Sequence, residues 1–185
     1  MIASFFEGAA QSPLPCSWAI LVPALLLAFS TRGIRVLVVY SATLVFFAWL
    51  VVAGWVVPQL WAAGLVLLAA ALAWWRGGPG IVVAAAIGAG VAWAWRPCVG
   101  PALGDALNTA QRHPVAALPA LAVFLLGVLA VGFAAGRLLR FLPSRGSAAT
   151  RFPAGVVGLV GASMIVGLYE PLASIFARWS TQLWA

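Results

Sequence analysis

The sequence predicts an all-α membrane protein in which six transmembrane helices form two inverted three-helix repeats, with helices 1 and 4 broken at a Pro-Cys step. Of the 185 residues, 65% are hydrophobic and only 7% are charged, whereas soluble proteins average about 45–50% apolar and about 25% charged residues. Apolar segments of about 20 residues, the length that crosses a bilayer core, follow one another along the chain. The two cysteines, Cys16 and Cys98, each follow a proline inside an apolar segment. We therefore expect residues 1–185 to form a single transmembrane domain.

The first repeat is predicted over about residues 1–77 and contains three spans of membrane-crossing length. These spans cover about 3–30, 34–54 and 56–75. Span 1 is unusually long and is predicted to break near Ser12–Cys16, because proline is accepted at the first position of a helix and not in its interior. The first half of this span contains Glu7, which is tolerated at membrane depth only where it faces protein or a water-filled cavity.

The second repeat is predicted over about residues 78–178 and has the same organisation. Its spans cover about 80–109, 115–138 and 153–176. Span 4 is again long and is predicted to break near Arg96–Pro101, at the second Pro-Cys step. Because each half has an odd number of crossings, the second half is inverted relative to the first, and a two-fold axis in the membrane plane relates them.

The basic charge of the chain predicts its orientation. The formal net charge is +7, and the arginines fall singly or in small groups between apolar runs, which favours contact with anionic lipid headgroups over nucleic acid. With the N-terminus outside, the inner loops contain Arg32, Arg35, Arg76, Arg137, Arg140, Arg145 and Arg151. The outer segments contain only Arg112 and Arg178. The positive-inside rule therefore predicts a multi-pass membrane protein with both termini extracytoplasmic.

The two Pro-Cys steps stand 82 positions apart, at equivalent places in the predicted repeats. Proline begins a helix well, so each thiol is expected in the first turn of a half-helix, where the helix dipole favours the thiolate. Burial in apolar surroundings favours the neutral thiol instead. Inverted symmetry brings the two breaks toward the repeat interface, and Cys16 and Cys98 can form a disulfide if their Cα atoms approach within about 7 Å. The alternative is two unrelated buried cysteines.

The segment AIGAGVAWAWRPCVGPALGDAL, residues 86–107, resembles the Gly-x-Ala-Phe-Ala-x-Gly-Trp-Thr-Pro-Cys-Ile-Gly-Pro-x-Leu-Gly signature of the CcdA family, which is related to the transmembrane domain of DsbD. The residues in register are Pro97, Cys98, Gly100, Pro101, Leu103 and Gly104. The first half is similar to the family's Ser-Pro-Cys-Val-Leu-Pro-Leu-Val-Pro motif more loosely, through Pro15, Cys16 and a displaced Pro23. The small members of the family also have six spans.

The resemblance implies a thiol–disulfide electron carrier that takes electrons from cytoplasmic thioredoxin and passes them to extracytoplasmic thioredoxin-like proteins, as in cytochrome c maturation. It makes Cys16 and Cys98 the reversible redox pair, and implies an oxidoreductase-type activity that needs no cofactor. The motif residues expected to shape the helix breaks or to allow close approach of the backbone are Pro15, Pro23, Pro97, Gly100, Pro101 and Gly104. The expected partners are the two thioredoxin-type proteins and membrane lipids, and the resemblance implies a location in the bacterial inner membrane.

The sequence departs from the family pattern at three positions, and two of these departures introduce charged residues. Ala19 stands where the family has a proline three residues after the first cysteine. Arg96 and Asp105 stand where the family has a small or hydroxyl residue and an alanine, and together with Glu7 they are candidates for a polar path. Asp105 is equally consistent with a residue near a helix end that reaches the interface, and Arg96 with a lipid or carbonyl partner. His113 and two distant cysteines make no recognisable metal site.

Two other functions fit the same sequence. One is a small solute or ion exporter on a related inverted-repeat fold, in which Asp105, Glu7 and Arg96 line a substrate path. The other is a non-catalytic membrane subunit that assembles with a larger complex. Single substitutions of Cys16 and Cys98 by serine separate the relay from the exporter, because only the relay needs both thiols.

Overall fold

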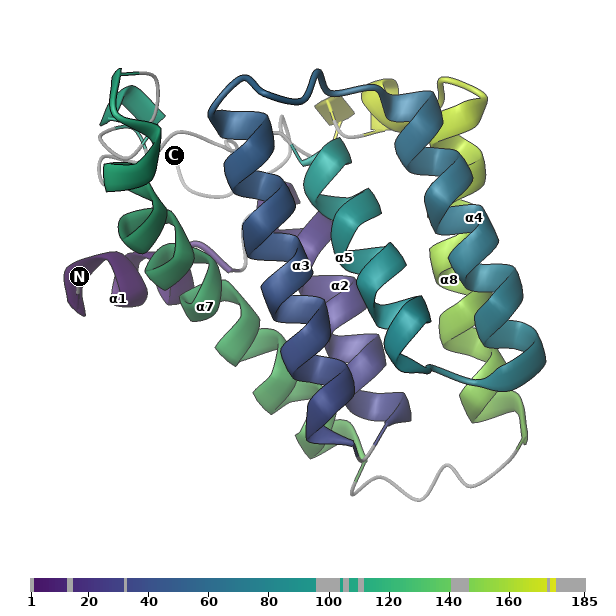
Figure 1. The fold of residues 1–185 in the computed structure, drawn as a ribbon. Coiled ribbons are helices and arrows are strands. Elements are labelled where there is room, and N and C mark those ends of the chain that lie inside the picture. Colours follow the sequence, from purple (N-terminus) through teal and green to yellow (C-terminus); the bar gives the residue numbers. More distant parts are fainter. Residues whose placement is uncertain are drawn as a thin grey trace.

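The computed structural model describes residues 2–12, 15–31, 33–95, 104, 107–109, 112–140, 147–172 and 174–175, and all the regular secondary structure in this part of the chain is helical. The helices, labelled as in Figure 1, are α1 (Ile2–Ala10), α2 (Pro15–Ser30), α3 (Ile34–Val52), α4 (Leu60–Gly77), α5 (Ile81–Ala94), α7 (Pro114–Leu139) and α8 (Ser147–Ile165). Helices α3, α4 and α7 have the length and apolarity needed to cross a membrane. The apolar segments Ser17–Ser30, Ile81–Ala94 and Arg151–Ile165 are shorter. The predicted all-α fold is therefore confirmed for the described residues.

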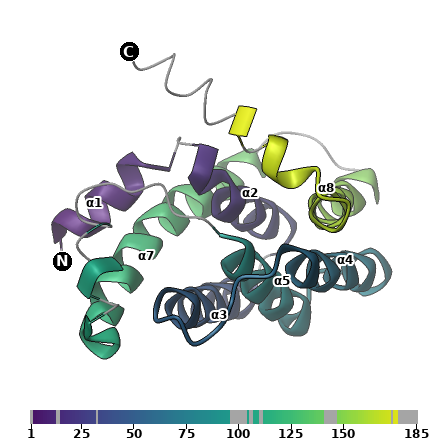
Figure 2. The same ribbon diagram turned by 90° about the horizontal axis from the view of Figure 1, so that it is seen from above.

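Helices α2 and α5 lie at the centre of the bundle and contact one another (Figure 2). Helix α2 packs against α7 and α8, and α5 packs against α3 and α4. Each central helix therefore lies against two helices from the other half of the chain. In Figure 1, α3, α5 and α8 run upward, whereas α2, α4 and α7 run downward. The most extensive interface joins α4 to α8.

Glycines allow the helices to approach closely. At the α4–α8 interface, a Cβ atom at Gly64 would lie 2.6 Å from the Gly161 carbonyl oxygen, and one at Gly161 would lie 2.8 Å from the Gly64 carbonyl oxygen. Gly88 of α5 lies against the backbone of α3. Gly132 and Gly136 of α7, spaced four apart, lie against α2. Small residues at this spacing are typical of membrane helices, because lipid supplies no hydrophobic force between helices and close van der Waals packing has to hold them together.

Helix α1 lies across the bundle instead of extending the line of α2 (Figures 1 and 2). It crosses α7 at two glycines: Gly8 of α1 packs on the backbone of Phe124, and Gly127 of α7 packs on the backbone of Phe5. The junction between α1 and α2 falls where span 1 was predicted to break, near Ser12–Cys16. The polar first half of the predicted span is thus a separate helix that packs on protein.

Helix α8 ends at Ile165, well before the predicted end of span 6 at about residue 176. Gly167 has a φ angle of +76°, in the left-handed region that glycine adopts without the steric cost of a Cβ atom. The N–H groups of Leu168 and Gly167 donate to carbonyls in the last turn of α8, at 2.9 and 3.4 Å. These bonds form a Schellman C-cap, which stops the helix. The chain then makes a short helical turn at 169–172.

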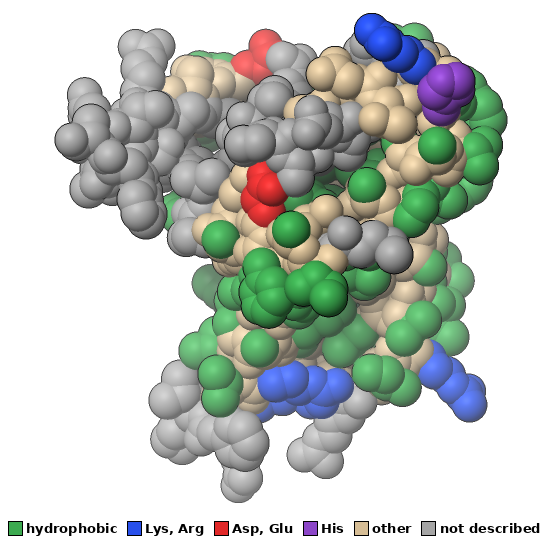
Figure 3. Space-filling view, turned by 90° about the vertical axis from the view of Figure 1, so that its left-hand side faces the viewer, with side chains coloured by type: hydrophobic (Ala, Val, Ile, Leu, Met, Phe, Trp, Pro, Cys, Tyr) green, Lys and Arg blue, Asp and Glu red, His purple; other side chains and the backbone are tan. Residues whose placement is uncertain are grey.

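Most of the described arginines lie at one end of the bundle, whereas Arg112 lies at the other. The lower end in Figure 1 contains the arginines at the start of α3, the end of α4, the end of α7 and the start of α8, which are Arg35, Arg76, Arg137, Arg140 and Arg151. On the face shown in Figure 3, basic side chains lie at this end and also at the top beside the histidine, whereas acidic side chains lie only in the upper part. This uneven distribution is the arrangement expected of a protein that follows the positive-inside rule.

Candidate functional site

The first Pro-Cys step opens helix α2. The helix begins at Pro15, so the backbone of Cys16 lies in its first turn, as expected for proline at a helix start. The side chains of these two residues lie outside the described part of the chain. On either side, Ser12 and Ser17 are only 5% and 6% exposed. The described residues that flank Cys16 therefore include two buried hydroxyl groups.

Pro23 lies inside α2, about 1.7 turns beyond Ser17. It has no N–H group, so the Ala19 carbonyl receives no helical hydrogen bond from position 23. The next carbonyl, that of Ile20, accepts a hydrogen bond from the Tyr40 hydroxyl of α3 at 3.0 Å. Tyr40 is fully buried. The proline-containing segment of α2 is thus held to α3 by a side chain from another helix.

The second Pro-Cys step follows helix α5, but most of its motif lies outside the described residues. Helix α5 ends at Ala94, and Trp95, which follows it, is 6% exposed. Gly104 is helical and partly buried. The predicted site residues outside the described part are Arg96, Pro97, Cys98, Gly100, Pro101 and Asp105. What the described residues establish is that α2, which carries Cys16, contacts α5, which leads toward Cys98.

Glu7 lies on α1, partly buried, where its carboxylate accepts a hydrogen bond from the Gln11 amide at 3.1 Å. Residues four apart lie on one face of a helix, so the pair forms a local polar patch. The other two candidates for the polar path, Arg96 and Asp105, lie outside the described residues. The described residues contain no group of three or more His, Cys, Asp or Glu side chains that could hold a metal ion.

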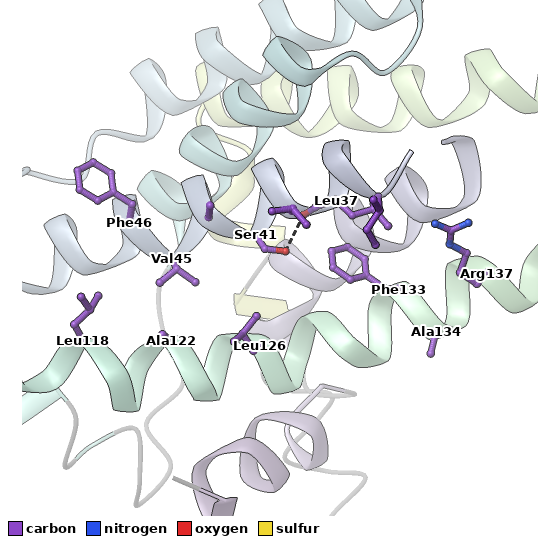
Figure 4. Close-up of a pocket in the computed structure, with 13 residues that line it drawn as sticks. Leu37, Ser41, Val45, Phe46, Leu118, Ala122, Leu126, Phe133, Ala134 and Arg137 are labelled. Atoms are coloured by element: carbon purple, nitrogen blue, oxygen red, sulfur yellow. Dashed lines mark hydrogen bonds between the residues drawn. The ribbon is translucent and has the colours of Figure 1, made fainter. Parts of the chain in front are cut away.

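Sequence reasoning missed a groove between α3 and α7. It has a volume of about 740 Å³ and is lined almost entirely by apolar side chains (Figure 4). Arg137 lies at one end of the groove, and Phe46 and Leu118 lie at the other. The only polar side chain between them is that of Ser41, whose hydroxyl donates to the Leu37 carbonyl of its own helix at 2.8 Å. Lining residues at helical spacing on two separate spans look like ordinary lipid-facing positions in a sequence.

Two further tertiary hydrogen bonds hold α7 in place. The Trp49 indole N–H of α3 donates to the Pro114 carbonyl at 2.7 Å, at the start of α7. The Arg140 guanidinium, just beyond the other end of α7, donates to the Phe29 carbonyl near the end of α2 at 2.6 Å. These bonds fix both ends of the helix that forms one wall of the groove.

Comparison of the chain with protein-family models, with curated proteins and with solved structures yields no match. The class of the protein therefore follows from its own features. The described residues form an all-helical bundle, three of whose helices are long and apolar enough to cross a membrane. The chain is a helical membrane protein.

Proposed function

We propose that this protein is a CcdA-like transmembrane carrier of reducing equivalents, with Cys16 and Cys98 as its reversible disulfide couple. The observation that carries the proposal is the repeated Pro-Cys step, once in each half of a membrane protein that has only two cysteines. The start of α2 at Pro15 is consistent with the role assigned to the first step. The motif around Cys98 resembles the CcdA signature, and this resemblance supplies the choice of partners.

The packing of the helices supports an inverted repeat of six spans. If α2 corresponds to α5, α3 to α7 and α4 to α8, the contacts of α2 with α7 and α8 correspond to those of α5 with α3 and α4. The members of each pair run in opposite directions in Figure 1, as a two-fold axis in the membrane plane requires. The helices that carry or lead to the two cysteines then face each other across that axis.

The proposed orientation places both termini outside a bacterial inner membrane. The arginine-rich end of the bundle faces the cytoplasm under the positive-inside rule, and thioredoxin is the reductant on that side. A thioredoxin-like protein on the other side receives the electrons. Because the two partners lie on opposite sides of the membrane, the cysteine pair has to be accessible from each side in turn. Inverted-repeat membrane proteins provide such alternating access to a central site.

The proposed chemistry is two successive thiol–disulfide exchanges. A thiolate of reduced thioredoxin attacks the Cys16–Cys98 disulfide, forming a mixed disulfide and releasing the other cysteine, which takes up a proton. The second thioredoxin thiol then resolves the mixed disulfide. Two electrons and two protons have been transferred, leaving thioredoxin oxidised and Cys16 and Cys98 as a dithiol. The dithiol reduces a disulfide of the extracytoplasmic partner in the same manner and is itself reoxidised.

A thiol-alkylation gel shift on the full chain in membranes tests this proposal directly. After mild oxidation the wild type should take up no mass-tagged maleimide, and after reduction it should take up two. Cys16→Ser and Cys98→Ser should each take up one tag under both conditions and should lose reduction of the extracytoplasmic partner. Wild type that takes up two tags after mild oxidation would contradict the proposal.

Ser17→Ala is a matched control, because Ser17 is buried beside Cys16 but offers no thiol. It should keep the disulfide and the transfer of electrons. In reconstituted vesicles, each single cysteine variant should also trap a mixed disulfide with thioredoxin or its outer counterpart. If both serine variants instead transport a small solute at the wild-type rate, the exporter is the correct function. If neither activity depends on the cysteines, the non-catalytic subunit is favoured.

A further inference from the structure

The groove between α3 and α7 has no role in the proposed electron transfer. Its walls come from one face of each of the two helices, and their side chains leave a channel of about 740 Å³. This volume lies within the roughly 300–1,000 Å³ range of small-ligand sites. Such a channel at the surface of a helical membrane protein opens toward lipid, so its natural occupant is apolar along most of its length.

One end of the groove is basic. Arg137 lines this end. Arg140 follows Arg137 by about one helical turn, and Arg35 is adjacent in sequence to the lining residue Ile34. The chain has only three acidic residues, Glu7, Asp105 and Glu170. The two that the structure describes, Glu7 and Glu170, belong to α1 and to the turn after α8, away from the arginine-rich end. Arg137 therefore gives this end of the groove a positive charge that an anionic ligand can meet.

We propose that the groove binds one anionic glycerophospholipid, with its phosphate on Arg137 and an acyl chain along the apolar walls. The charge pattern selects this occupant, because a helix of a second copy would bring apolar surface but no negative charge to the basic end. Basic pockets between transmembrane helices are known to hold anionic headgroups in this way. This inference rests on the membrane class of the protein and does not depend on the redox function.

The dimensions fit a lipid in one leaflet. From Ile34 to Phe46 the α3 wall is about 18 Å long at 1.5 Å per residue. An acyl chain reaches through half of a hydrocarbon core that is about 30 Å thick, so the groove can hold one chain over its full length. With Arg137 at the end of α7, the phosphate lies at the headgroup level of the leaflet that faces the arginine-rich end.

Native mass spectrometry of the purified full chain, titrated with palmitoyl-oleoyl phosphatidylglycerol or phosphatidylcholine, tests the proposal. The wild type should retain one phosphatidylglycerol in preference to phosphatidylcholine. Arg137→Gln should weaken the retention about fivefold, the factor that corresponds to about 1 kcal/mol for one arginine near an anionic surface. Arg76→Gln, at the same end of the bundle but on α4, should leave it unchanged.

The apolar wall has its own matched pair. Ala122→Trp fills the groove and should displace the lipid, whereas Ala130→Trp, on the exposed side of α7 and outside the groove, should not. The proposal would be overturned by equal retention of the two lipids, by equal loss in Arg137→Gln and Arg76→Gln, or by full retention in Ala122→Trp. A dimer that Ala122→Trp dissociates would identify a second copy as the occupant and would likewise overturn it.

Discussion

At the scale of single residues, the bundle is connected by a few side-chain hydrogen bonds to backbone carbonyls. The bond from Tyr40 to the Ile20 carbonyl is the most enclosed of them, because Tyr40 is fully buried and its ring also packs edge-on against Phe133, with centroids 6.4 Å apart. It reaches the part of α2 between Cys16 and Pro23. The bond therefore links the proposed redox helix to α3.

We predict that Tyr40→Phe lowers the free energy of unfolding by about 0.5–1.5 kcal/mol, because the ring contact stays and only the hydrogen bond is lost. Denaturation of the purified protein in detergent, followed by circular dichroism, measures the change. Ser41→Ala is the control: its hydroxyl bonds within its own helix, to a carbonyl that keeps its backbone partner, so the change should be under about 0.5 kcal/mol. Equal decreases in the free energy of unfolding for the two variants would show that the Tyr40 hydrogen bond contributes no more to stability than a bond within one helix.

None of these bonds could be predicted from the sequence. Tyr40 and Ile20 are separated by a loop and lie on different helices, and only the packing decides which tyrosine meets which carbonyl. The same holds for Trp49 and the Pro114 carbonyl, which are 65 positions apart.

At the scale of helices, two glycines of α8 have opposite surroundings. Gly161 faces Gly64 of α4 with almost no space between them, whereas a Cβ atom at Gly155 would meet nothing within 4 Å. Alanine is preferred over glycine in a helix by about 0.5–1 kcal/mol. The cost of overpacking a close contact is larger, about 1–3 kcal/mol. Space, and not helix propensity, therefore decides the sign of each substitution.

We predict that Gly155→Ala raises the free energy of unfolding by about 0.5–1 kcal/mol, whereas Gly161→Ala lowers it by about 1–2 kcal/mol. The same detergent denaturation measures both, and the shared helix makes each variant the control for the other. Changes of the same sign would show that α4 and α8 are less closely packed than the structure has them.

Hydropathy located the helices well, since length and apolarity are properties of the sequence alone. The predicted spans 34–54 and 115–138 lie within two residues of α3 and α7. The ends were less predictable. The prediction for span 6 overlooked Gly167, whose left-handed backbone closes α8 eleven residues early, and span 1 became two helices because α1 finds its packing surface on α7. The cysteine pair remains a prediction, since Cys98 and its motif lie outside the described residues.

At the scale of the whole molecule, the arginine-rich end and the opposite end define two sides. The loop 53–59 and the loop 78–80 lie at opposite ends of α4 (Figure 1). If the arginine-rich end faces the cytoplasm, the first loop is extracytoplasmic and the second is cytoplasmic. Gln59 and Gly80 are exposed in these loops, so both positions can report the orientation.

We predict that Gln59→Cys, in a background of Cys16→Ser and Cys98→Ser, reacts with a membrane-impermeant maleimide on intact cells. Gly80→Cys should react only after the membrane is permeabilised. The parent without cysteines gives the background labelling. The opposite pattern would reverse the orientation, and thioredoxin would then be on the wrong side for the proposed relay.

The central positions of α2 and α5 also affect the order in which the helices can pack during synthesis. Synthesis proceeds from the N-terminus, so α5 finds α3 and α4 already in the membrane. The order is reversed for α2. It is among the first helices to be inserted, whereas its partners from the second half of the bundle, α7 and α8, are inserted last. The largest contact surface of the helix that bears Cys16 is therefore covered only after α7 has been inserted. The ribosome has to finish the protein before the bundle can close around it.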